Sequence, residues 1–104
     1  MIPQEKLNAL VARFEKIEAQ MATATKGEEI VRLAKEHGEL KPVAGKAKEL
    51  VAMRRQIADL KDLAESKDAE MAAMARDELQ ALKAKAPQLE DDLQIMLLPK
   101  DKAD

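Results

Sequence analysis

The sequence lacks most of the residues that carry catalytic and cofactor chemistry. Its 104 residues include no cysteine, tryptophan or tyrosine, one phenylalanine and one histidine, His37. The lack of cysteine excludes disulfides and thiolate chemistry, and His37 has no second imidazole or thiolate with which to share a zinc ion. Glycine-rich phosphate loops and nucleophile elbows are also missing. The sequence therefore predicts no catalytic residue, no cofactor site and no metal site.

Long apolar runs and a strong charge bias are missing as well. No run approaches the roughly 18 apolar residues of a membrane span, and no secretory signal pattern is visible at the N-terminus. The net charge is −2, which argues against a surface devoted to nucleic acid. A single aromatic residue leaves almost no platform for base stacking. We therefore expect a cytoplasmic protein with no membrane partner.

The residues that are present favour long helices. Nineteen alanines and thirteen leucines dominate, and 37% of the residues are charged, a composition typical of helical proteins. Valine, isoleucine and threonine total 11 and are scattered, so no strand is expected. Four apolar stripes and three short breaks predict an all-α, antiparallel, coiled-coil-like bundle. The first stripe consists of Leu7, Leu10, Phe14, Ile17 and Met21, widened by Val11. The predicted helices cover residues 3–23, 26–40, 42–65 and 67–98, the last one long and kinked at Pro87.

Local signals set the predicted breaks between these helices. Thr25 starts a T-x-x-E capping-box pattern before the second helix. Pro42 disfavours helical geometry at Lys41 and predicts a break there. Ser66 is expected to cap a helix that begins at Lys67.

The last predicted helix carries an unbroken heptad seam. Its apolar members are separated alternately by four and three residues: Ala75, Leu79, Leu82, Ala86, Leu89, Leu93 and Met96. A helix with this pattern buries one narrow stripe against partner helices.

Methionines and charged runs have both structural and functional interpretations. Five methionines on or beside the stripes are interpreted as core filler, with an adaptable binding surface as the alternative: Met21, Met53, Met71, Met74 and Met96. Glu90-Asp91-Asp92 is interpreted as a solvated face. Arg54 occupies a position on the apolar seam of its predicted helix, between Leu50 and Ile57, and is expected to pack its stem and send its guanidinium into solvent. The basic stretches Lys46-Ala47-Lys48 and Arg54-Arg55 are interpreted as ordinary solvated charge, with a small RNA-contacting patch as the less favoured alternative.

Several motifs resemble the first domain of bacterial class I peptide chain release factors. They are Met71-x-x-Met74-Ala75-x-Asp77-Glu78-Leu79, Gln88-Leu89-Glu90, Lys35-Glu36-His37, Leu40-Lys41-Pro42-Val43 and Leu97-Leu98-Pro99-Lys100-Asp101. The Leu-Leu-Pro-Lys-Asp ending resembles the type 1 branch, which reads UAA and UAG stop codons. Pro87 and Lys102 depart from the family pattern.

This resemblance implies a binding module in translation termination, not an enzyme. The family hydrolyses peptidyl-tRNA with a Gly-Gly-Gln loop and reads codons with a Pro-x-Thr tripeptide, and neither motif occurs in this sequence. Residues 1–98 would then form the helical N-terminal domain, and 99–104 a linker stub to decoding and hydrolysis domains. The implied partners are the stalk base of the large ribosomal subunit and the class II release factor GTPase, without direct codon contact. Self-association of the isolated domain is left open.

In a four-helix bundle the turns at 23–27 and 65–68 lie at one pole, facing away from the end that leads to further domains. Both turns are short and polar. The residues expected to bind a partner are Thr25, Lys26, Gly27, Ser66 and Lys67. The alternative is that these residues only make turns.

Two other classes of function remain open. A free-standing coiled-coil adaptor explains the heptads but not Leu-Leu-Pro-Lys-Asp. An RNA-gripping helical arm, like those appended to some tRNA synthetases, needs a continuous basic face, which the balanced charge opposes. Codons after Asp104 that continue into a Gly-Gly-Gln region would favour the release factor interpretation.

Overall fold

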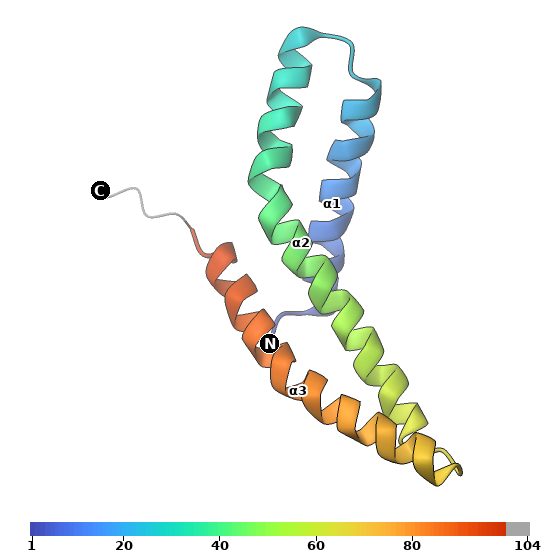
Figure 1. The fold of residues 1–104 in the computed structure, drawn as a ribbon. Coiled ribbons are helices and arrows are strands. Elements are labelled where there is room, and N and C mark those ends of the chain that lie inside the picture. Colours follow the sequence, from blue (N-terminus) through green and yellow to red (C-terminus); the bar gives the residue numbers. More distant parts are fainter. Residues whose placement is uncertain (100–104) are drawn as a thin grey trace. The chain divides into compact units, whose positions relative to one another are not determined.

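Three α-helices make up the part of the chain that the computed structural model describes, residues 1–99 (Figure 1). They are α1 (Gln4–Thr23), α2 (Gly27–Leu63) and α3 (Ala69–Leu97). No strand occurs in this part, so the all-α class is confirmed and the number of four helices is wrong. The chain divides into an N-terminal unit, Met1–Lys48, and a C-terminal unit, Glu49–Asp104, with α2 passing through both. Most of the predicted linker stub, residues 100–104, lies outside the described residues.

The predicted break at Pro42 is absent, because α2 continues through this proline. An interior proline removes one backbone hydrogen bond and crowds a carbonyl one turn earlier, at a cost of about 3 kcal/mol. Four of the residues that follow it on α2 are buried: Val43, Ala44, Ala47 and Leu50. Burying one valine or leucine side chain contributes roughly 1.5–3 kcal/mol. Packing of an uninterrupted helix therefore outweighs the local preference that predicted a break.

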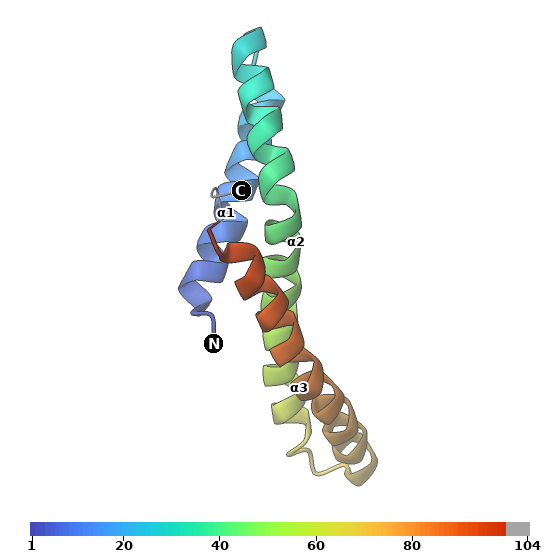
Figure 2. The same ribbon diagram turned by 90° about the vertical axis from the view of Figure 1, so that its left-hand side faces the viewer.

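In the N-terminal unit, α1 runs antiparallel to the first part of α2 (Figures 1 and 2). The Pro3 carbonyl starts α1 by accepting from the N–H groups of Lys6 and Leu7, at 3.1 and 3.3 Å. The predicted apolar stripe of this helix is confirmed. Leu7, Phe14 and Ile17 are buried, and Leu10, Val11 and Met21 are half-buried.

In the C-terminal unit, the second part of α2 runs antiparallel to α3. The heptad seam of α3 is largely confirmed: Ala75, Leu89 and Leu93 are buried and Leu79, Leu82 and Ala86 are half-buried, whereas Met96 is exposed. The helix continues through Pro87 and is curved in Figure 1.

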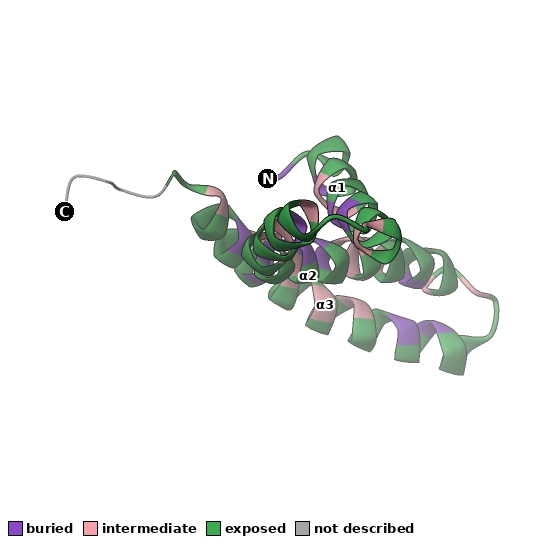
Figure 3. Ribbon diagram, turned by 90° about the horizontal axis from the view of Figure 1, so that it is seen from above, coloured by how far each residue is buried: buried purple, intermediate pink, exposed green. Residues whose placement is uncertain are grey.

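The core is thin. Most positions on every helix are exposed, and buried positions form short patches (Figure 3). Within the described residues no polar or charged residue is buried. None of the three helices, over the same residues, has the apolar length that a bilayer crossing needs.

Candidate interaction surfaces

The turn between α1 and α2 carries three of the predicted partner-binding residues, all exposed: Thr25, Lys26 and Gly27. The Lys26 carbonyl accepts from the Ile30 N–H at 3.0 Å, which starts α2. Of the hydrogen bonds recorded for residues 1–99 none involves the Thr25 hydroxyl, so the predicted capping box is not formed. An open hollow of about 440 Å³ beside the turn is lined by residues of both charges, Lys26, Gly27, Glu28, Glu29 and Arg32. Its mixed charge does not select a partner of one sign.

The turn between α2 and α3 is fixed by three side chains. Asp68, not Ser66, caps α3, since its Oδ1 accepts from the N–H groups of Glu70 at 3.1 Å and Met71 at 3.3 Å. Ser66 Oγ instead accepts from the Asp68 N–H at 3.1 Å. Arg76 Nη2 donates to the Ala64 carbonyl at 3.2 Å. Ser66 therefore shapes the turn, whereas Lys67 is exposed and presents its positive charge to solvent.

The prediction that placed the two turns at one pole rested on a break at Pro42, which α2 does not have. Because α2 is one helix from Gly27 to Leu63, one turn precedes its first residue and the other follows its last. They also belong to different units. Partner binding by each turn stays a prediction, and each turn has to be tested separately.

His37 lies in a packing cluster of the N-terminal unit. Its ring stacks on Phe14, with centroids 4.6 Å apart and planes inclined by 26°. The Nε2 of His37 lies 3.2 Å from Glu18 Oε2. The Phe14 ring has a further contact, since Lys48 Nζ lies over it at 5.5 Å from the ring centroid. These contacts join α1 to α2 through stacking, a hydrogen bond and a cation–π interaction. Among residues 1–99, no group of three or more His, Asp or Glu side chains is arranged to hold a metal ion.

An ion pair that the sequence interpretation missed joins α2 to α3 in the C-terminal unit. Arg54 Nη2 donates to Glu90 Oε1 at 2.9 Å, and the two side chains are only 21% and 15% exposed. The predictions that Arg54 points into solvent and that Glu90 belongs to a solvated face are therefore wrong. The sequence signal was Arg54 itself, a charge on the apolar seam of its helix, but the partner lies 36 residues away.

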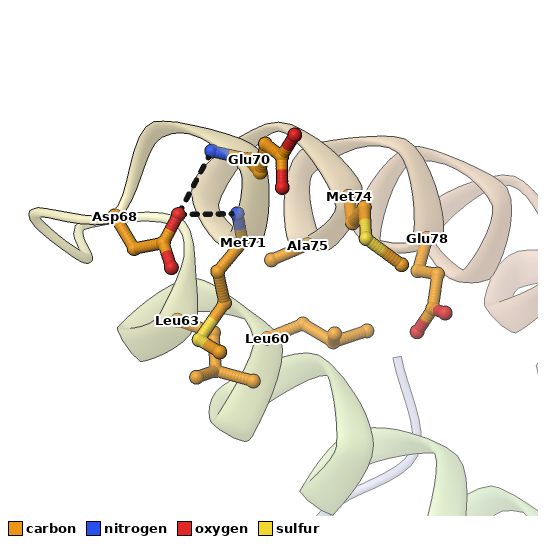
Figure 4. Close-up of a pocket in the computed structure, with 8 residues that line it drawn as sticks. All are labelled: Leu60, Leu63, Asp68, Glu70, Met71, Met74, Ala75 and Glu78. Carbon is orange, nitrogen blue, oxygen red and sulfur yellow. Dashed lines mark hydrogen bonds between the residues drawn. The ribbon is translucent and has the colours of Figure 1, made fainter.

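A groove of about 310 Å³, which we call the methionine groove, lies beside the α2–α3 turn. Its lining residues come from both helices: Leu60, Leu63, Asp68, Glu70, Met71, Met74, Ala75 and Glu78. Figure 4 shows Met71 pointing toward Leu63, with Leu60 facing the α3 side chains. The floor of this groove is apolar, and every charged residue on its rim is acidic.

The core-filler interpretation is wrong for the three methionines of α3. Met71 is 47% exposed, Met74 is 67% exposed and Met96 is 39% exposed, whereas Met21 and Met53 are half-buried. Met74 directly precedes seam residue Ala75, so it lies about 100° around the helix from the seam. That offset was the available signal for the alternative interpretation, an adaptable binding surface.

Comparison with known proteins gives the family context of this helical fold. The family model described as the PCRF domain matches residues 10–104. The chain belongs to the PCRF domain family. It is 48% identical over 101 residues to "Peptide chain release factor 1" of Caulobacter vibrioides and 48% identical over 105 residues to the protein of that name from Dinoroseobacter shibae. The corresponding protein of Bartonella tribocorum is 44% identical over 105 residues.

These alignments include nearly all of this chain but a minor part of each relative. They cover 97%, 100% and 99% of the chain, and 28%, 29% and 29% of the three relatives. The PCRF chain thus spans less than a third of the length of the curated relatives it matches. No solved structure matches it.

Proposed function

We propose that this PCRF domain is the helical first domain of a type 1 peptide chain release factor and takes part in translation termination at UAA and UAG codons. The observation that carries the proposal is the family match over residues 10–104. The identity of 43–48% to proteins named "Peptide chain release factor 1" supports the type 1 assignment.

The domain acts in this proposal as a binding module. Its glycines are the isolated residues Gly27, Gly38 and Gly45, so it has no Gly-Gly-Gln sequence of its own. Hydrolysis and codon reading would be carried out by other parts of the full-length factor. The linker assigned to residues 99–104 would lead to those parts. Codon-dependent peptide release by the isolated 104-residue chain would contradict this division of labour.

The proposed partners are the ribosomal stalk base and the class II release factor GTPase. Polar turns before and after α2 are the proposed contacts. One acts through exposed Lys26 with Thr25 and Gly27, and the other through exposed Lys67 with half-buried Ser66. A lysine at a short turn can approach a protein or RNA surface closely, and its charge steers association.

The test uses the full-length factor with Lys26→Glu and Lys67→Glu introduced one at a time. We expect at least one of them to slow GTPase-driven dissociation from the ribosome by about threefold or more. Peptide release at UAA and UAG should be retained, because neither turn supplies a codon-reading residue. Helicity, followed by circular dichroism, should also be retained.

Matched controls are Lys16→Glu on α1 and Lys85→Glu on α3, which make the same charge change at exposed helix positions. If the Lys26→Glu and Lys67→Glu factors both dissociate from the ribosome as fast as the two control variants, the turns are not the contact surface. If a full-length protein that contains this domain shows no stop-codon-dependent release at all, the termination role itself is wrong.

A further inference from the structure

We propose that the methionine groove binds a basic amphipathic α-helix of a partner protein. The inference stands on the surface of the C-terminal unit alone and does not depend on the role in termination. It commits to one occupant, a helix with apolar anchors on one side and lysine or arginine residues along both edges. The length of the groove, its floor and its charge each support this occupant.

The length of the groove fits a helix better than a small molecule. A second hollow of about 210 Å³, lined by Gln56, Asp59, Leu60, Glu78 and Leu82, shares Leu60 and Glu78 with the methionine groove. The two hollows together extend along α3 from Asp68 to Leu82. At 1.5 Å per residue this is a track of about 20 Å, the length of roughly 14 residues of α-helix.

The floor of the groove suits apolar helix anchors. Met71 and Met74 line it with largely exposed side chains (Figure 4). Methionine is flexible and polarisable and adapts to differently shaped apolar partners. Grooves of this kind receive helices whose anchors recur at i, i+3 or i+4, and i+7.

The rim of the groove selects a basic partner. Its charged lining residues are Asp68, Glu70 and Glu78, and the adjoining hollow adds Asp59, with no lysine or arginine lining either one. Neither Glu70 nor Glu78 forms an ion pair with any cation of residues 1–99. Between residues 59 and 78 the sequence has seven acidic and three basic residues, whereas the whole chain has a net charge of only −2. Charge complementarity therefore favours a partner rich in lysine or arginine.

The same charges disfavour a second copy of this chain as the occupant. A two-fold dimer pairs a surface with itself, which would set one acidic rim against the other. Like charges brought together in this way oppose association.

The test titrates the full 104-residue chain with a fluorescent probe peptide of about 18 residues, built from leucine anchors and lysine edges on an alanine helix. A second peptide replaces each lysine with glutamate. Fluorescence anisotropy should show saturable binding of the basic peptide with one site per chain. The acidic peptide should bind at least about tenfold more weakly, because its charges repeat those of the rim.

Chain variants then locate the site. Met71→Gln with Met74→Gln should weaken binding by about tenfold or more, since apolar contact area is lost. Met96→Gln, the same change at an exposed position of α3 outside the groove, should leave binding unchanged. Glu70→Gln with Glu78→Gln should weaken binding by about threefold or more and reduce its salt dependence, whereas Asp91→Asn with Asp92→Asn, an equal charge change, should do neither. Circular dichroism checks that each variant keeps its helicity.

Three results would overturn the proposal. One is equal binding by groove and control variants. Another is equal affinity for the basic and acidic peptides. The third is a dimer in light scattering that Met71→Gln with Met74→Gln dissociates, because the groove would then receive a second copy.

Discussion

The N-terminal unit and the C-terminal unit are both antiparallel pairs of helical segments joined by a short turn, but different side chains connect the helices in each. The N-terminal unit uses a stacked ring pair, Phe14 and His37, with an exposed carboxylate beside it. The C-terminal unit uses a half-buried ion pair, Arg54 with Glu90. The two turns differ as well, since Asp68 caps α3 whereas the turn before α2 begins its helix with a backbone carbonyl.

This difference shows how a chain with few aromatic residues connects its helices. The only phenylalanine and the only histidine are both used in the N-terminal unit. The C-terminal unit has neither and relies on a charge pair across the apolar seam. The Coulomb attraction within an ion pair is stronger when the pair is shielded from water. Removing one partner of such a pair also costs more free energy, because the other charge stays half-buried. We therefore expect the two units to respond differently to polar substitutions and similarly to proline replacement.

The largest expected effect comes from the two interior prolines, one in each unit. Replacing Pro42 or Pro87 with alanine should stabilise the chain by about 1–3 kcal/mol, because alanine restores a backbone hydrogen bond and has the higher helix propensity. Part of the gain is lost because alanine leaves the unfolded chain more freedom. Urea unfolding followed by circular dichroism measures both variants against the parent chain. A loss of stability for either one would mean that its unit depends on the bend that proline introduces.

A smaller effect is expected from the ion pairs, and it should separate the two units. Glu90→Gln should lower the free energy of unfolding by about 1–2 kcal/mol, because it removes the negative charge that lies 2.9 Å from the half-buried Arg54 guanidinium. Glu36→Gln, which removes the carboxylate that pairs with exposed Arg32 in the N-terminal unit, should cost about 0–0.5 kcal/mol. A double-mutant cycle with Arg54→Met isolates the coupling between residues 54 and 90. Equal losses for Glu90→Gln and Glu36→Gln would remove the distinction drawn between the units.

The smallest expected effect concerns the turns. Asp68→Ala should cost about 1 kcal/mol through loss of the helix cap, and Asp68→Asn should recover most of it. Thr25→Ala should change stability by less than about 0.5 kcal/mol, since its hydroxyl makes no capping bond. Thermal unfolding of the three variants gives the comparison. If Thr25→Ala costs about as much stability as Asp68→Ala, the capping box forms in solution.

Local sequence patterns predicted most of the helical structure of both units. α1 and α3 have nearly the predicted bounds, and the turn after Leu63 lies where a break was expected. The stripe of α1 and most of the α3 seam are buried as expected. These features depend on residues a few positions apart, because a helix repeats every 3.6 residues and a turn is set by its own side chains. The family resemblance also came from contiguous motifs, and the family match confirmed it.

The sequence by itself thus determined the helix content, two of the three predicted breaks and the family. Tertiary structure alone decided that α2 passes Pro42, that Arg54 meets Glu90, and that Met71 and Met74 stay exposed. Each outcome depends on residues distant in sequence: burial that offsets the cost of a proline, a carboxylate 36 residues away, and the absence of any covering segment over the methionines among residues 1–99. Periodicity indicates which side of a helix is apolar, but only packing decides how much of that side is covered.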